Sequence, residues 1–157
     1  MTHQVGKHSV GVGVGAYIMD GQKVLLMFRP KTISPHRTTV GMWSVPGGQI
    51  DFGETAENAV IREAKEELGI EISIKKFIGY SNQILSKAHW VSLHFLCQIE
   101  SGVSKIMETE KCERIEWFDV GNLPENSGIT HVLRPSLLLG YLNKEEFNKR
   151  SAQTKES

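Results

Sequence analysis

Apolar residues follow a strand-like pattern over most of the chain. Residues 10–18 alternate small and apolar positions (V-G-V-G-V-G-A-Y-I), which is typical of a strand whose glycines let another backbone or a ligand approach closely. Asp20-Gly21 is a strong hairpin signal, and residues 23–28 (K-V-L-L-M-F) supply the returning strand. Further strands are predicted at residues 71–83, 90–100 and 114–118.

Two segments carry helical signals instead. Thr55 is a good N-cap and Gly69 a good stop signal, so they bound a first helix of about four turns. Residues 130–142 place apolar side chains at helical spacing along one stripe. Strands that surround an early and a late helix predict an α/β fold, an α/β/α sandwich with a mixed central sheet.

The remaining segments are predicted to be irregular. Residues 29–41 contain two prolines and three basic residues, which favours a long exposed loop. Pro46-Gly47-Gly48 predicts a sharp turn, followed by a short extended piece at residues 49–52. The tail at 143–157 is polar, so we expect one domain over residues 1–157 with its core at about 10–142.

Composition narrows the class of protein. Hydrophobic residues make up 39% and charged residues 23%, which is ordinary for a globular protein. Eighteen basic and eighteen acidic residues cancel, so we expect no nucleic acid polymer as a partner. No apolar run is long enough to cross a bilayer, and Cys97 and Cys112 lack metal-site spacing, so we expect a cytoplasmic protein with reduced thiols.

Three carboxylates are predicted to share one face of the first helix. The spacings of three and four among Glu63, Glu66 and Glu67 place them on adjacent turns. Like charges there repel, so the arrangement is better explained by a hard cation such as Mg²⁺, which prefers oxygen ligands. The alternative is a solvated acidic face with Lys65 interspersed.

The carboxylates stand within a longer pattern, G-Q-I-D-F-G-E-T-A-E-N-A-V-I-R-E-A-K-E-E-L-G-I. Gly48 is followed after five residues by Glu54, and after seven more by Arg62. This string resembles the signature of the Nudix superfamily over residues 48–70. Its one departure is Ala64, where the signature prefers a bulkier aliphatic residue.

The resemblance implies a Nudix fold and a division of labour within the signature. Arg62 pairs with Glu54, which locks the loop against the helix, and Glu66 and Glu67 share metal and general-base work. Mg²⁺ is the implied cofactor, with Mn²⁺ as a substitute. The implied metal ligands are the carbonyl of Gly47 and the side chains of Glu63, Glu66 and Glu67.

Residues outside the glutamate cluster carry more open assignments. Among four glutamates of the later acidic loop, we favour Glu113 as an additional metal ligand. Arg29 and Gly48 are predicted substrate contacts, although surface charge explains Arg29 equally well. Trp43 can stack on a nucleobase, but aromatic residues in strands more often belong to the core.

The substrate is expected to be a nucleotide. The string around the signature resembles the MutT-like branch, which cuts (d)NTP to (d)NMP and pyrophosphate in nucleotide-pool sanitation. A nucleotide-sugar or ADP-ribose-type diphosphatase is the alternative, although residues 83–86 lack the proline that ADP-ribose hydrolases usually carry there. A non-catalytic nucleotide-binding module is the second alternative, and a homodimer is compatible with the family.

Overall fold

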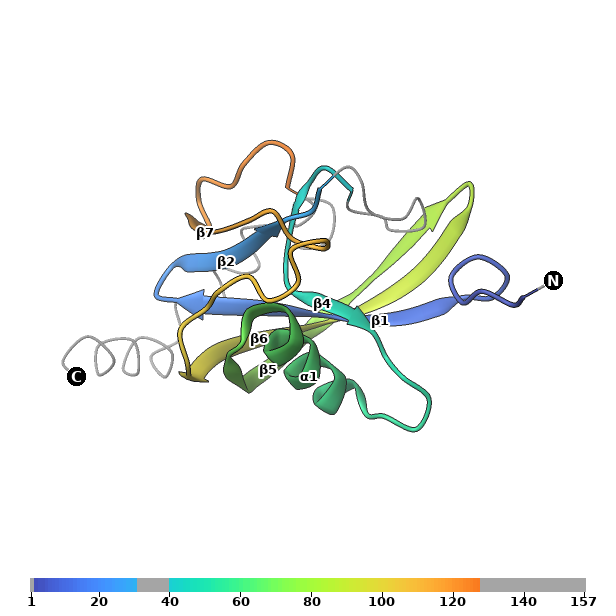
Figure 1. The fold of residues 1–157 in the computed structure, drawn as a ribbon, viewed down its shortest axis with the longest axis horizontal. Coiled ribbons are helices and arrows are strands. Elements are labelled where there is room, and N and C mark those ends of the chain that lie inside the picture. Colours follow the sequence, from blue (N-terminus) through green and yellow to red (C-terminus); the bar gives the residue numbers. More distant parts are fainter. Residues whose placement is uncertain (1, 31–39, 128–157) are drawn as a thin grey trace.

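A computed structural model describes residues 2–30 and 40–127 and contains a seven-stranded sheet packed against a helix (Figure 1). The strands run in the order β3-β2-β1-β6-β5, with β4 paired to β1 and β7 paired to β2. The elements are β1 (Gly11–Asp20), β2 (Lys23–Phe28), β3 (Trp43–Ser44), β4 (Gly47–Gln49), α1 (Ala56–Leu68), β5 (Glu71–Leu85), β6 (Ala88–Ser101) and β7 (Arg114–Asp119).

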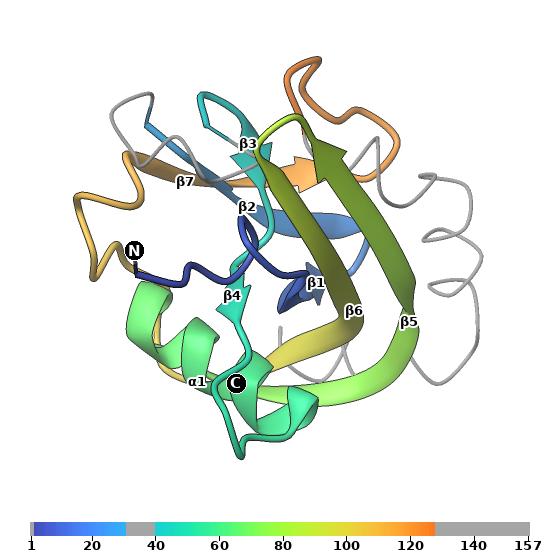
Figure 2. The ribbon, with the colours of Figure 1, turned by 90° about the vertical axis from the view of Figure 1, so that its right-hand side faces the viewer.

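The sheet is mixed, as predicted, because β1 runs parallel to β6 and antiparallel to β2 and β4. Asp20 pairs with Lys23 where β1 turns into β2, which confirms the predicted hairpin. Figure 2 shows β5 and β6 side by side as a long antiparallel pair. Through the parallel β1–β6 pair, this hairpin is joined to β1. The same strand β1 pairs with β4, which is followed in the chain by α1.

Both faces of the central strands are buried. Ala16 and Ile18 of β1 pack on the α1 side, where the helix contributes Ala59, Val60, Ala64 and Leu68. Tyr17 and Met19 point to the opposite face and join a second apolar cluster. Burial of each large apolar side chain contributes roughly 1.5–3 kcal/mol, so the two clusters fix the sheet and α1 together. The predicted helix at 130–142, the polar tail and most of the predicted loop lie outside the described residues.

The structure corrects one prediction and sharpens another. Gly47 and Gly48 do not form a sharp turn: they belong to β4 and pair with Gly15 and Val14, because the β1 ladder continues to bond this segment after a bend at Pro46. In β1, a side chain takes the space that a glycine leaves. A Cβ atom on Gly11 would lie 2.4 Å from the ring of Trp90.

The structure also shows where the two cysteines lie and how long the described helix is. Cys97 and Cys112 are buried free cysteines, which agrees with a packing role. Among residues 2–30 and 40–127, no helix is long and apolar enough to span a bilayer.

His94 is a buried polar residue on β6. Its Nε2 lies 3.1 Å from Ser81 Oγ, and its ring stands edge-on to Tyr17 at 5.3 Å between centroids. Nδ1 has no hydrogen-bond partner in the part of the chain that the structure describes. Burial lowers the pKa of His94 from 6.5 to about 4, so the folded protein keeps this imidazole neutral.

We therefore expect the free energy of unfolding to fall as the pH drops from 6.5 toward 4. In that range the unfolded chain takes up a proton on His94 and the folded chain does not, so the loss approaches about 3 kcal/mol. His94→Gln removes this contribution. Urea denaturation at pH 7 and pH 4.5 should show a smaller pH-dependent loss in the variant, and equal losses in both proteins would contradict the assignment.

Candidate active site

Helix α1 is fixed at both ends by the caps that the sequence predicts. Thr55 Oγ1 accepts a hydrogen bond of 3.1 Å from the backbone N–H of Asn58. Gly69 adopts a left-handed conformation with φ 67°, and its N–H donates to the carbonyl of Lys65 at 2.9 Å. A side chain at this φ would be strained, so glycine is the residue that ends the helix here.

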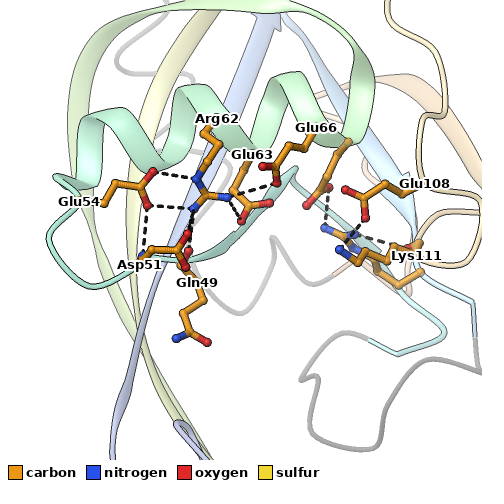
Figure 3. Close-up of polar contacts among 10 residues, drawn as sticks. Gln49, Asp51, Glu54, Arg62, Glu63, Glu66, Glu108 and Lys111 are labelled. Atoms are coloured by element: carbon orange, nitrogen blue, oxygen red, sulfur yellow. Dashed lines mark hydrogen bonds and ion pairs between the residues drawn. The ribbon is translucent and has the colours of Figure 1, made fainter.

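Arg62 joins α1 to the loop that precedes it (Figure 3). Its Nε donates to Glu54 Oε1 at 2.7 Å and its Nη2 donates to Glu54 Oε2 at 2.9 Å, which is a bidentate pair. Nη2 also donates to the carbonyl of Gln49 at the end of β4. One planar guanidinium thus fixes the helix, the loop and the strand relative to one another.

The opposite side of the same guanidinium meets two further glutamates. Arg62 Nη1 donates to Glu63 Oε1 at 3.0 Å and to Glu66 Oε2 at 3.2 Å. The carboxylate of Asp51 lies 3.6 Å from Nη2. Arg62 is therefore the common counter-ion of four carboxylates, and its positive charge offsets part of their mutual repulsion.

The Arg62–Glu54 pair is electrostatically strong. The hydrogen bond from Arg62, followed by the backbone N–H of Asp51, lowers the pKa of Glu54 to about 2. The hydrogen bond to Glu54 in turn raises the pKa of Arg62. Both groups are therefore charged throughout the neutral range.

Glu67 is bound by a different arginine. Its Oε2 accepts a bond of 3.1 Å from Nη2 of Arg29, and both side chains are almost fully buried, with 2% and 4% exposed. Arg29 also donates to Ser44 Oγ and to the carbonyl of Lys111. Removing one partner of such a buried pair typically costs about 3–5 kcal/mol.

Two glycines of β4, Gly47 and Gly48, allow close packing next to the glutamate cluster. A Cβ atom on Gly47 would lie 2.0 Å from the backbone oxygen of Val14, so β1 and β4 approach each other only because position 47 has no side chain. A Cβ atom on Gly48 would lie 2.4 Å from Glu63 Oε1. The Glu63 carboxylate therefore rests directly against the backbone of β4.

Comparison with known proteins identifies this arrangement. The family model of the NUDIX domain matches residues 10–136, most of the chain. The chain belongs to the Nudix family.

The curated relatives that resemble this chain include proteins named as pyrophosphatases and hydrolases. An ADP-ribose pyrophosphatase of Methanocaldococcus jannaschii is 34% identical over 116 residues, which cover 73% of this chain and 64% of the relative. An NAD-capped RNA hydrolase NudC of Vibrio atlanticus is 32% identical over 74% of this chain and 40% of its own length. This chain thus spans less than two thirds of both relatives.

Solved structures agree on the fold. The crystal structure of a MutT NUDIX hydrolase from Burkholderia pseudomallei has a TM-score of 0.67 and 31% sequence identity, and covers 78% of this chain and 92% of that chain. The expected Nudix fold, an α/β sandwich with a mixed sheet, is therefore confirmed.

Most of the predicted Nudix site residues come together. Glu54, Arg62, Glu63 and Glu66 form the cluster around the guanidinium, with Gly48 against Glu63. Glu67 extends from the same helix to Arg29, a pairing that sequence reasoning missed because the two residues are 38 positions apart. Residues close in sequence do not predict this pair. The one indication is that Arg29 is a basic residue at the end of an apolar strand.

Trp43 and Glu113 lie apart from the cluster. Trp43 is 6% exposed and packs between Phe28 and Phe118, with ring centroids at 5.3 and 4.8 Å, which corresponds to the core alternative. The Glu113 carboxylate is 58% exposed and lies 3.9 Å from Arg114. Within the described part of the chain, Glu113 makes no polar contact with the glutamates of the signature; it directly precedes β7, where its N–H donates to the carbonyl of Phe28.

Glu108 offers a better-placed acidic residue. It forms an ion pair of 2.5 Å with Lys111, whose carbonyl accepts a bond from Arg29. Figure 3 shows Glu108 and Lys111 near the end of the helix that carries Glu66. Sequence spacing could not distinguish Glu108 from Glu113, because the fold of the loop decides which one turns inward.

The cluster has the charge and donor chemistry of a hard-cation site. Among the described side chains, five carboxylates meet two guanidiniums, an excess of three negative charges. All the atoms that could coordinate a metal here are oxygens, which suits Mg²⁺ or Mn²⁺. In the described residues, however, no three acidic, histidine or cysteine side chains are arranged as a ready-made metal cage. Arg62 engages oxygens of both Glu63 and Glu66, so metal binding requires these contacts to rearrange.

The two glycines should respond differently to alanine. Gly47→Ala places a methyl group against backbone, which cannot move without breaking the β1–β4 ladder, so we expect about 1–3 kcal/mol of destabilisation. Gly48→Ala meets the end of a glutamate side chain, which can turn away, so we expect a smaller loss of stability but weaker metal binding. Thermal unfolding and Mn²⁺ titration test this contrast, and a more stable Gly47 variant than Gly48 variant would contradict it.

Proposed function

We propose that the chain is a Nudix hydrolase that cleaves the diphosphate linkage of nucleotides with Mg²⁺, or with Mn²⁺ as a substitute. The preferred reaction converts (d)NTP to (d)NMP and pyrophosphate in nucleotide-pool sanitation in the cytoplasm. The observation that carries this proposal is the Arg62-centred cluster, in which every acidic position of the family signature is present. A non-catalytic binding module would not need to maintain this crowded and mutually repulsive set.

Each residue has a proposed task. Glu63, Glu66 and Glu67 would hold the cation, with the carbonyl of Gly47 as a further donor. Arg62 and Glu54 keep α1 and its preceding loop in place while the substrate binds and leaves. The bound cation supplies charge stabilisation at phosphate oxygens and a lower pKa for an attacking water.

Proton transfer is assigned jointly to Glu66 and Glu67. The Glu66 side chain is 49% exposed, so water reaches it from solvent, whereas the Glu67 side chain is buried beside Arg29. This difference favours Glu66 as the first acceptor of the proton. Glu67 then contributes mainly as a fixed ligand.

ADP-ribose-type hydrolysis is the second candidate function. It is favoured by the 34% identity to the archaeal protein named ADP-ribose pyrophosphatase. Residues 83–86 lack the proline expected for that branch. Both reactions break the same type of bond, so they differ in what is attached to the diphosphate.

A nucleotide panel with Mg²⁺ distinguishes the candidates. It should contain the common (d)NTPs, ADP-ribose, NAD and a nucleotide sugar, with pyrophosphate, phosphate and monophosphate measured separately. We expect pyrophosphate and (d)NMP from triphosphates, and no turnover in EDTA. Hydrolysis of ADP-ribose with inert triphosphates would select the second candidate, and no turnover with any member would favour a binding module.

Glu66→Gln tests the carboxylate cluster with little risk to the fold. The side chain is half exposed, and we expect kcat to fall about 100-fold or more because a ligand and proton acceptor is lost. Glu57→Gln on the exposed first turn of α1 is the matched control and should retain wild-type kcat. Wild-type turnover by the Glu66 variant would refute its role. Glu67→Gln is a less clean test, because it also breaks the buried pair with Arg29.

A further inference from the structure

Arg29 connects three separate segments beneath the glutamate cluster. It directly follows β2, and its Nε donates to Ser44 Oγ of β3 at 3.1 Å. Its Nη1 donates to the Lys111 carbonyl at 3.4 Å, and its Nη2 donates to Glu67 Oε2 at 3.1 Å. Three different nitrogens of one planar group thus have three partners, so the plane of the guanidinium is fixed.

This fixed plane in turn determines where Glu67 points. Both side chains are buried, and a buried carboxylate is strongly favoured to stay with its counter-ion. The main chain adds a second restraint, because the carbonyl of Glu67 accepts a hydrogen bond of 3.1 Å from Met107 N–H. The orientation of Glu67 therefore depends on β2, β3 and the loop that carries Lys111.

The two arginines divide the acidic residues between them. Arg62 contacts Glu54, Glu63 and Glu66 near the surface, where its side chain is 28% exposed. Glu67 forms its buried ion pair with Arg29. The inner carboxylate thus pairs with a different guanidinium from the outer ones.

We propose that Arg29 is a positioning residue that holds Glu67 in the orientation needed for metal binding. This inference rests on the proposed function, because it assigns Arg29 to the metal site of the same reaction. It replaces the expectation that Arg29 contacts a substrate phosphate. A side chain with 4% of its surface exposed offers almost no area to a ligand, and its donors are already engaged within the protein.

The two roles predict different measurements. A phosphate contact mainly changes the KM for the nucleotide. A positioning residue changes metal affinity and kcat, while the nucleotide KM at saturating metal stays nearly constant. Metal affinity can be measured without any nucleotide, which separates this proposal from the choice of substrate.

Arg29→Lys is the principal variant, because it keeps the positive charge but cannot reach Ser44, Lys111 and Glu67 with one planar fork. Ser44→Ala is the second variant, since it removes the Nε acceptor and leaves Arg29 and Glu67 in place. Arg114→Lys is the control: Arg114 lies over the rings of Phe28 and Trp43, outside the carboxylate cluster. Circular dichroism and thermal melts establish that each variant is folded.

Mn²⁺ binding to the nucleotide-free protein, followed by electron paramagnetic resonance, is the decisive readout. We expect Arg29→Lys to weaken Mn²⁺ binding about 10-fold and to lower kcat, with nucleotide KM within about twofold of wild type. Ser44→Ala should shift Mn²⁺ affinity in the same direction by less, and Arg114→Lys should match wild type.

Contrary outcomes are equally specific. A raised nucleotide KM with unchanged Mn²⁺ affinity in Arg29→Lys would overturn the proposal in favour of a substrate contact. If that variant does not fold, unchanged Mn²⁺ affinity and kcat in Ser44→Ala overturn it, as would a wild-type protein that binds no Mn²⁺. A wild-type protein that binds Mn²⁺ but hydrolyses no nucleotide would instead sink the proposed function, while the effect of the variants on Mn²⁺ binding still decides the role of Arg29.

Discussion

The arrangement of this site depends on the mutual repulsion of its carboxylates, which the neighbouring residues have to offset. Glu63, Glu66 and Glu67 lie within five positions of one helix, and the preceding loop adds Asp51 and Glu54. Two guanidiniums offset part of this charge, one near the surface and one in the interior. Among the described side chains of the cluster, the carboxylates outnumber the guanidiniums, and this negative excess favours binding of a divalent cation.

The sheet places these guanidiniums where they are needed. Continuous apolar runs in β1 and β2 bury both faces of these strands, and α1 packs against one of them. Because β4 pairs with β1, the carbonyl of Gln49 and the backbone of Gly48 come beneath the helix. Arg29 reaches the same helix from the end of β2. The acidic face is therefore supported from two directions by one sheet.

Local rules predicted the features that depend on neighbouring residues. The caps at Thr55 and Gly69 and the hairpin after Asp20 follow from side chains within a few positions, and the structure has them as expected. The resemblance to the Nudix signature implied the pairing of Arg62 with Glu54, which the structure contains.

Long-range packing decided the features that the sequence left open. The pairing of Arg29 with Glu67 depends on where β2 ends relative to α1, and the burial of Trp43 depends on β7 lying beside β2. The same dependence explains why Glu113 lies apart from the cluster and why the predicted turn at Pro46 continues as a strand. Residue type and spacing alone do not determine such tertiary neighbours.

The attachment points on α1 also have a mechanical meaning. Arg62 and Glu67 are five residues apart, so their side chains leave the helix in directions that differ by roughly 140° about its axis. Arg62 is bound to the preceding loop and to β4. Glu67 is bound to Arg29, which follows β2 and contacts β3. A rod held at two such angles cannot roll without breaking one tie. Torsional stiffness of this kind would let the helix keep its carboxylates in register through repeated cycles of ligand entry and release.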